Sequence, residues 1–320
     1  MLRLYLPLTE DKMIQTRPFD DNHNDFENLW RFLQQDYARK QDRFIWLVSR
    51  LGDWRYGLWN ETKQHPAFFR DNAQLWVDDS DQPAGFVISE NGDNIIFIFT
   101  AQGYEHLYAE ILDWTLEHWG SRFTTLKTEV HEFQQEALAA LERRGFRSLG
   151  VEATTRQYDL RAREMEPVIL ATGFQLVNMA ENGDYRAKGL LYMNGFGGKD
   201  QVTEHDLALF ENSRKNLAYD PRLDFSVIAP DGVHVATCVG FIDPASKMAE
   251  VEKVCTHSAY RRRGLGEAVI RECFQRLRQC GIDTAYITGY SGEANGLYEK
   301  LGPCKHKQWF HYESGSYDKN

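Results

Sequence analysis

The chain has 320 residues, of which 42% are hydrophobic and 26% are charged. This composition excludes a disordered or fibrous chain, and the length favours about two globular domains. The 37 Lys and Arg against 47 Asp and Glu give a net charge of −10, which argues against a nucleic-acid binder that works by neutralising phosphates. No apolar run is long enough for a transmembrane helix.

Charge and cysteine are spread unevenly along the chain. Residues 1–160 hold 17 basic and 26 acidic residues, whereas residues 161–320 hold 20 and 21. The N-terminal run MLRLYLPLTEDK has too short an apolar stretch for a secretory signal. All five cysteines fall in the second part without zinc-site spacing, so we expect no metal site and reduced core thiols in a cytoplasmic protein: Cys238, Cys255, Cys273, Cys280 and Cys304.

In the first part, a short segment that ends at Pro18 precedes a helix-like segment at 24–35. Alternating apolar residues then predict strands at 74–77, 84–89 and 95–100, separated by turns rich in Asp, Asn and Gly. A second helix is predicted around 136–145, where Gly145 marks its end.

A polar segment at 160–167, which ends in a proline, is typical of a linker. After it the same order of elements is predicted again: a strand at 173–177, a helix at 184–194, and strands at 224–229, 233–241 and 248–256. Shifting the chain by 157 residues aligns 136–146 with 293–303, with Glu, Ala, Glu and Gly coinciding. We interpret this as a tandem duplication, although any amphipathic helix that ends in Gly would look similar.

The sharpest motif follows the strand predicted at 248–256. It reads Arg261-x-x-Gly264-x-Gly266 and leads into an amphipathic helix. Glycines let a ligand approach the backbone closely, and the N–H groups at a helix N-terminus attract an anion such as a pyrophosphate. Glu267 follows Gly266, where a Walker loop needs Lys, and Val269 stands where a dinucleotide fingerprint needs a small residue.

These residues, together with the later run Leu297-Tyr-Glu-Lys-Leu-Gly302, resemble the core of the GNAT (GCN5-related N-acetyltransferase) family. The resemblance is strong over 224–313 and weaker back to 172. It implies an α/β (α+β) fold with two tandem GNAT-like domains, each a mixed central sheet flanked by helices. The expected domains are 1–160, degenerate and without bound CoA, and 161–320, the catalytic acetyltransferase domain.

The resemblance implies transfer of an acetyl group from acetyl-CoA, as co-substrate, to a primary amine that we expect to be small. Tyr298 matches the family's general acid, and Glu252 is the candidate general base, with Glu250 and His257 as weaker candidates. The residues that we expect to bind the co-substrate are Val254, Cys255, Thr256, Arg261, Arg262, Arg263, Gly264, Leu265, Gly266, Glu267, Ser291 and Asn295. Two departures are Ser291, where the family often has Asn, and Pro303, where Phe is usual.

The same shift places Tyr104, Leu107 and Ala109 opposite the motif, and Leu141 opposite Tyr298. The first domain therefore lacks the residues that CoA needs. Its negative charge has two possible roles. The first domain forms a wall of the acceptor cleft, where Asp78, Asp79 and Asp81 attract a cationic amine, or the charge only keeps the protein soluble. The alternative function is a non-catalytic acyl-CoA-binding or protein-interaction module. We expect no nucleic-acid or membrane partner, and a homodimer stays open.

Overall fold

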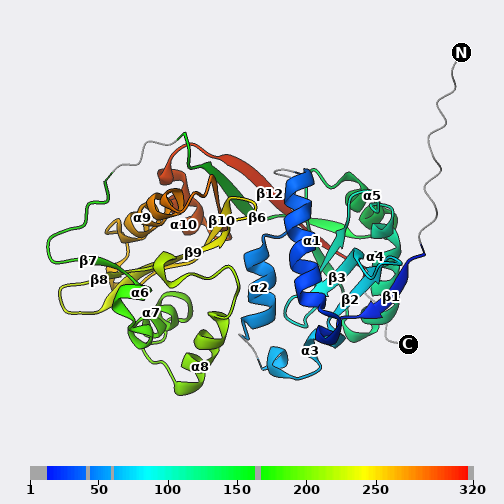
Figure 1. Ribbon diagram of the computed structural model, residues 1–320, viewed down its shortest axis with the longest axis horizontal. Helices are drawn as coiled ribbons and strands as arrows, with labels where there is room; N and C mark the ends of the chain where they lie inside the picture. The colour runs from blue at the N-terminus through cyan, green and yellow to red at the C-terminus, as the bar shows by residue number, and fades with distance from the viewer. Residues whose placement is uncertain (1–12, 41–43, 59–60, 163–166, 316–320) are drawn as a thin grey trace, which may run out of the picture.

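The computed structural model describes residues 13–40, 44–58, 61–162 and 167–315. The N-terminal run 1–12 and residues 163–166 of the expected linker lie outside the described residues. Figure 1 shows two lobes, with the first part of the chain in one and most of the second part in the other. In the part of the chain that the structure describes, every helix is too short or too polar to cross a lipid bilayer.

The first part of the chain contains six strands and five α-helices within these described ranges. In chain order they are β1 (Gln15–Pro18), α1 (Asp25–Lys40), α2 (Val48–Tyr56), α3 (Phe68–Asp71), β2 (Ala73–Val77), β3 (Pro83–Ser89), β4 (Ile95–Thr100), α4 (Leu107–Trp119), β5 (Lys127–His131), α5 (Gln135–Arg143) and β6 (Arg147–Asp159).

The second part repeats the order of strand, helices and strands. Its elements are β7 (Gln175–Asn178), α6 (Met179–Asn182), α7 (Tyr185–Gly197), α8 (Glu204–Ser213), β8 (Asp224–Ile228), β9 (His234–Asp243), β10 (Met248–Thr256), α9 (Leu265–Gln279), β11 (Thr284–Gly289), α10 (Gly292–Tyr298) and β12 (Lys305–Glu313). The strands expected at 95–100 and 248–256 have those bounds, so these two predictions are confirmed.

All these strands form one sheet with the order β1-β2-β3-β4-β5-β12-β6-β11-β10-β9-β8-β7. Each half of the sheet is mixed. The pairs β4–β5 and β10–β11 are parallel, and the other neighbouring pairs are antiparallel. The expected α/β class with mixed pairing in each half is therefore confirmed, whereas the two expected sheets are joined into one.

The two halves exchange their last strands, which the sequence did not indicate. By chain order β6 would follow β5, but β12 lies beside β5 and β6 lies beside β11. The strands β6 and β12 also pair with each other from Lys305↔Gln157 to Glu313↔Arg147, and Figure 1 shows them running between the lobes. The position 160/161 thus separates two stretches of chain, whereas each half of the sheet contains one strand from the other stretch.

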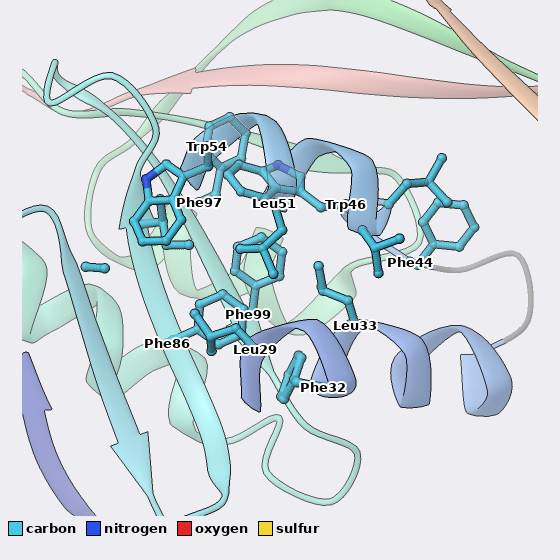
Figure 2. Close-up of a cluster of buried hydrophobic side chains, with 14 of the residues drawn as sticks. Leu29, Phe32, Leu33, Phe44, Trp46, Leu51, Trp54, Phe86, Phe97 and Phe99 are labelled. Carbon is cyan, nitrogen blue, oxygen red and sulfur yellow. The ribbon is translucent and has the colours of Figure 1, made fainter. Parts of the chain in front are cut away.

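The aromatic core of the first half lies where α1 and α2 cover the sheet (Figure 2). Phe86 and Phe99 stack with ring centroids 4.4 Å apart. The core continues into the second half, since the Phe44 ring meets Tyr286 on β11 edge-on at 5.1 Å. The two halves are therefore joined by packing as well as by exchanged strands.

The cysteines are all free thiols, but only three belong to the core. Cys238, Cys255 and Cys273 are buried, Cys304 is half-buried and Cys280 is exposed. Cys280 directly follows α9, whose apolar face ends before it. The expectation that all five are core thiols was thus wrong for the exposed Cys280, whereas the half-buried Cys304 packs against the edge of the second-half core.

Candidate active site

The strands β10 and β11 diverge at the centre of the second half of the sheet. They pair only from Met248↔Thr284 to Glu250↔Tyr286. On the other side of β10, the pairing with β9 is interrupted between Glu252 and Cys255, and Lys253 has a φ of 54°. Such a bulge re-aims the backbone and opens the sheet locally.

An outer cavity of about 730 Å³ lies at this opening. It brings together Glu252 and Val254 from β10 with Ser291 and Tyr298 from the start and end of α10. Glu252 and Tyr298, which are 46 positions apart in sequence, thus line the same cavity. The remaining wall comes mainly from α7 and α8.

Tyr298 is buried, with 5% of its surface exposed. Burial raises the pKa of its phenol, and the nearby Glu252 carboxyl raises it further. The phenol therefore stays protonated at neutral pH and is suited to donate a proton rather than to accept one.

Glu252 and Glu250 are two carboxyl groups on the same face of β10, because side chains alternate along a strand. Burial raises the pKa of Glu250 to about 7, against the hydrogen bond that Ser49 Oγ donates to it. Burial also raises the pKa of Glu252 well above its usual range, and the charges of Glu250 and Asp53 act in the same direction. A carboxyl with a raised pKa can take up a proton near neutral pH, as a general base must.

The N-terminus of α9 is open at its first turn. Gly264 precedes the helix with a φ of 77°, and no side chain caps the helix there. A Cβ on Gly264 would meet no heavy atom within 4 Å, so neighbouring residues do not crowd this position. A Cβ on Gly266 would lie 3.2 Å from Thr256 Oγ1, so this glycine lets α9 pack closely on β10. The N–H groups of this turn fit an anionic group such as a pyrophosphate.

The three arginines of the motif differ in what they contact. Arg261 donates to the carbonyl oxygens of Thr256 and Gly195, at 3.3 and 3.2 Å, and so joins β10 to α7. Arg263 lies over the ring of Tyr260 at 4.9 Å. Arg262 has a φ of 63° and is exposed. All three add positive charge beside α9, while Arg261 also holds the loop in place.

Four other expected co-substrate residues engage their side chains elsewhere. The Cys255 thiol packs against Gly195, and burial raises its pKa to about 12. Leu265 is part of the hydrophobic core. Glu267 pairs with Arg271 at 2.8 Å, and Thr256 Oγ1 lies against α9. The buried side chains of Cys255 and Leu265 leave only backbone atoms available to a ligand, and Cys255 is not placed to act as a nucleophile.

Ser291 and Asn295 behave differently from each other. Ser291 lines the outer cavity and caps α10, since its Oγ accepts from the Ala294 N–H at 3.2 Å. Asn295 does not line that cavity. Its Oδ1 accepts from Arg156 at 2.8 Å and sits close to Gly289, so its amide supports the helix.

Two other groups of candidates lie away from the opening. His257 caps the short turn Ser258–Tyr260 by accepting from the Ala259 N–H at 3.2 Å. The acidic residues expected to form a wall lie in the β2–β3 turn, where Asp81 pairs with Arg17 at 2.9 Å. None of Asp78, Asp79 and Asp81 lines the outer cavity. Asp53 on α2 does so instead.

Several residues of the outer cavity were not singled out from the sequence. Asp53 reaches it from the first half and pairs with Lys253 at 3.6 Å. Tyr290 follows β11, and α7 and α8 contribute aromatic rings. Helical spacing places Tyr185, Tyr192 and Phe196 along α7, but it does not say which partner this face meets. The aromatic side chains that line this wall are Tyr185, Tyr192, Phe196, Phe210 and Tyr219. Of these, Phe196 and Tyr219 lie in the segments 194–198 and 219–224, which the sequence suggested as close to the acceptor.

Comparison with protein-family models gives a match to the Acetyltransferase (GNAT) family over residues 191–302. Residues 191–302 form a GNAT-family domain. This range contains β10, α9, β11 and α10, and with them the diverging strands, the open helix N-terminus and Tyr298. A comparison with curated proteins finds no match.

Solved structures resemble the whole chain, not only this GNAT domain. A GCN5-related N-acetyltransferase from Sphaerobacter thermophilus is 18% identical, with 94% of this chain and 95% of that chain covered and a TM-score of 0.64. A tandem GNAT protein from the clavulanic acid biosynthesis pathway is 14% identical, with 94% and 98% covered and a TM-score of 0.63.

A GNAT-family acetyltransferase from Colwellia psychrerythraea is 12% identical, with 94% and 99% covered and a TM-score of 0.57. At such identities the likeness shows the fold. The chain therefore has the tandem-GNAT architecture, and its fold supports acetyl transfer in general.

Proposed function

We propose that the protein is an acetyl-CoA-dependent N-acetyltransferase, an acyltransferase of class EC 2.3.1.-, that acetylates a small primary amine. Both substrates bind before the reaction, and the amine attacks the thioester directly. The observation that carries this proposal is the meeting of Glu252, Val254 and Tyr298 in one cavity where β10 and β11 diverge.

The open first turn of α9 fits the pyrophosphate of acetyl-CoA, with Gly264 and Gly266 leaving the backbone accessible and Arg261, Arg262 and Arg263 beside it. Acetyl-CoA supplies the acetyl thioester. The bulge frees backbone groups of Lys253 and Val254 from the β9 ladder. In this proposal the Val254 N–H donates to the thioester oxygen as negative charge develops on it.

An alkyl ammonium carries a proton at neutral pH, because its pKa is about 10.4. Glu252 accepts this proton, directly or through one water molecule, and leaves the amine nitrogen free to attack the carbonyl carbon. The raised pKa of Glu252 makes the carboxyl basic enough for this step. The new C–N bond forms as the C–S bond breaks.

Tyr298 then donates the proton that the departing thiolate needs. Its phenol lines the same cavity and remains protonated, since burial raises its pKa. The attacking nitrogen loses its second proton to solvent, so the step leaves a free thiol and a neutral amide, and solvent returns a proton to the tyrosine.

We also propose that residues 1–160 are a degenerate GNAT-like domain without CoA, and that 161–320 are the catalytic stretch. In the first half the corresponding helix α4 starts after His106, and no side chain caps it. The carboxylate of Glu105 accepts from the Gly103 N–H at 2.8 Å just before this helix. A negative charge at that point repels a phosphate. Free thiols suit a cytoplasmic location, which we propose as well.

The test is an acceptor screen with the full chain. The protein is incubated with acetyl-CoA and a panel of primary amines, and both free thiol and acetylated amine are measured. We expect enzyme-dependent acetylation of at least one amine. If acetyl-CoA binds but no amine is acetylated, the chain is instead a non-catalytic acyl-CoA-binding module.

A further inference from the structure

A second, inner cavity of about 270 Å³ lies between the two halves. Its walls come from the segment that enters α2, from α2 itself, from β10 and from the exchanged strand β12. It adjoins the outer cavity, because Asp53, Phe241, Glu252 and Tyr290 line both. A water molecule occupies roughly 30 Å³, so the inner cavity can hold part of an organic ligand.

The inner cavity has more negative than positive groups. Its carboxyl groups are Asp53, Glu90, Glu250 and Glu252, and its cations are Arg50 and Lys307. Arg50 pairs with Glu90 at 2.8 Å, and Lys307 lies over the ring of Phe44 at 4.3 Å.

His131 also lines the cavity and is neutral, because burial lowers its pKa to about 4. Glu250 and Glu252 are half-buried, and neither is bonded to an arginine or lysine in the ion pairs of the described residues. A buried carboxylate is costly unless a cation or several hydrogen bonds balance it.

Aromatic rings complete the walls of the inner cavity. Trp46, with 1% of its surface exposed, lines it together with Phe44, Trp309 and Tyr290. Figure 2 shows Phe44 and Trp46 among the side chains of the first-half core, on the segment that leads into α2. The Trp46 Nε1–H is buried and has no hydrogen-bond partner in the described part of the chain. Aromatic faces beside carboxylates attract an alkylammonium group.

We propose that the inner cavity binds a second ammonium group of the acceptor, so that the acceptor is a linear diamine. The inference rests on the proposed function, since it places the reacting amine at Glu252, where the two cavities join, and the distal ammonium at Glu250. Glu250 and Glu252 are two residues apart on one strand, so their Cα atoms are about 6.6 Å from each other. That spacing is similar to the distance between the nitrogens of extended 1,4-diaminobutane.

In this arrangement the two carboxyl groups have different roles. Glu252 lines both cavities, whereas Glu250 lines only the inner one. Glu250 also accepts a hydrogen bond from the Ser49 hydroxyl. The distal ammonium remains charged throughout the reaction and stays on Glu250. Glu252 alone needs to exchange a proton with the reacting amine.

The experiment measures binding without turnover. The full chain, in the presence of CoA, is titrated calorimetrically with 1,4-diaminobutane and with n-butylamine, which has one amine on a chain of the same length. We expect the wild-type protein to bind the diamine at least about tenfold more tightly. This comparison needs no variant, so it remains decisive even if a substitution disturbs folding.

Glu250→Gln then removes the charge with little change in shape. We expect the ratio of the two affinities to fall to about one to three, whereas Glu117→Gln, an exposed change on α4, keeps the wild-type ratio. Equal binding of both amines by the wild type, or an unchanged ratio in Glu250→Gln, overturns the inference. If the diamine binds in this manner but no amine is acetylated, the proposed function fails while the cation site stands.

Discussion

The phenol of Tyr158 donates a hydrogen bond of 2.8 Å to the backbone carbonyl oxygen of Tyr298. Tyr158 is fully buried on β6, a strand that comes from the first stretch of the chain. Two residues earlier on the same strand, Arg156 donates to Asn295 Oδ1 at 2.8 Å and to Glu299 Oε1 at 2.6 Å. The first stretch of the chain therefore fixes the helix that carries the proposed acid.

Arg156 is expected to act as a positioning residue. Arg156→Met leaves Asn295 without its donor, and we expect the free energy of unfolding to fall by about 1–3 kcal/mol. We also expect kcat to fall more than the KM for acetyl-CoA rises, because α10 moves while the N-terminus of α9 does not. Arg156→Lys should restore part of kcat. Equal kcat in the wild type and Arg156→Met would argue against this role.

Removing the phenol of Tyr298 tests the proposed acid directly. We expect Tyr298→Phe to lower kcat by about 10- to 1,000-fold, while acetyl-CoA binding measured by titration stays within about twofold. The ring remains, so packing in the core is kept. Tyr312→Phe, which removes the phenol of a tyrosine that lines neither the outer nor the inner cavity, is the matched control. A rate for Tyr298→Phe equal to that of the wild type would rule out the acid.

The acid limb of the pH profile should report the two carboxyl groups on β10. A base must lose its proton before it acts, so kcat falls as the pH drops through the pKa of the pair, which burial raises to about 7 for Glu250. The charge of Asp53 raises the pKa of Glu252. Asp53→Asn should therefore lower that pKa and move the acid limb to lower pH.

Glu117→Gln serves as the control for this shift, since it removes a carboxylate that is exposed on α4. We expect its kcat–pH profile to superimpose on that of the wild type. A limb that stays in place in Asp53→Asn, or that moves to higher pH, would contradict the assignment of Glu252 as base.

Substitutions of the two motif glycines should impair the protein for different reasons. Gly264→Ala forces an L-residue into a φ of 77°, at a cost of about 1–2 kcal/mol, although nothing blocks the side chain. Gly266→Ala meets Thr256 Oγ1 at 3.2 Å and Leu297 at 3.3 Å, so α9 shifts and the KM for acetyl-CoA rises. Gly264→Asn should be more stable than Gly264→Ala in urea unfolding, because Asn tolerates this conformation better. Equal stability of the two would speak against the backbone explanation.

Residues 1–160 and 161–320 are not expected to fold separately. The first fragment lacks β12 beside β5, and the second lacks β6 beside β11, so each would expose an unpaired strand edge. We expect each fragment alone to aggregate or to lack a cooperative unfolding transition, and the co-expressed pair to assemble. A monomeric, cooperatively unfolding 161–320 fragment would show that β6 is dispensable.

Local patterns predicted the parts of the site that are close in sequence. The strand at 248–256, the glycine loop and the helix α9 form one continuous stretch, where periodicity and glycine chemistry act over a few residues. The repeated order of elements indicated two similar halves for the same reason. These predictions needed no knowledge of distant contacts.

Long-range pairing could not be predicted in this way. The sequence of β6 is compatible with an edge beside β5 or beside β11, and only the packed sheet selects the latter. Asp53 is one of 47 acidic residues, and nothing near it in sequence marks it as part of a cavity. Asn295 fits the family pattern for the co-substrate, yet it bonds to Arg156, which lies 139 residues earlier.

The exchanged strand β12 has a consequence for synthesis on the ribosome. β5 is made more than 170 residues before β12, its partner at Trp309↔His131. Until the end of the chain has emerged, the first half therefore has an open sheet edge and an incomplete core, and it cannot finish folding while the second half is being translated. Truncated translation products should thus be open to proteases in both halves.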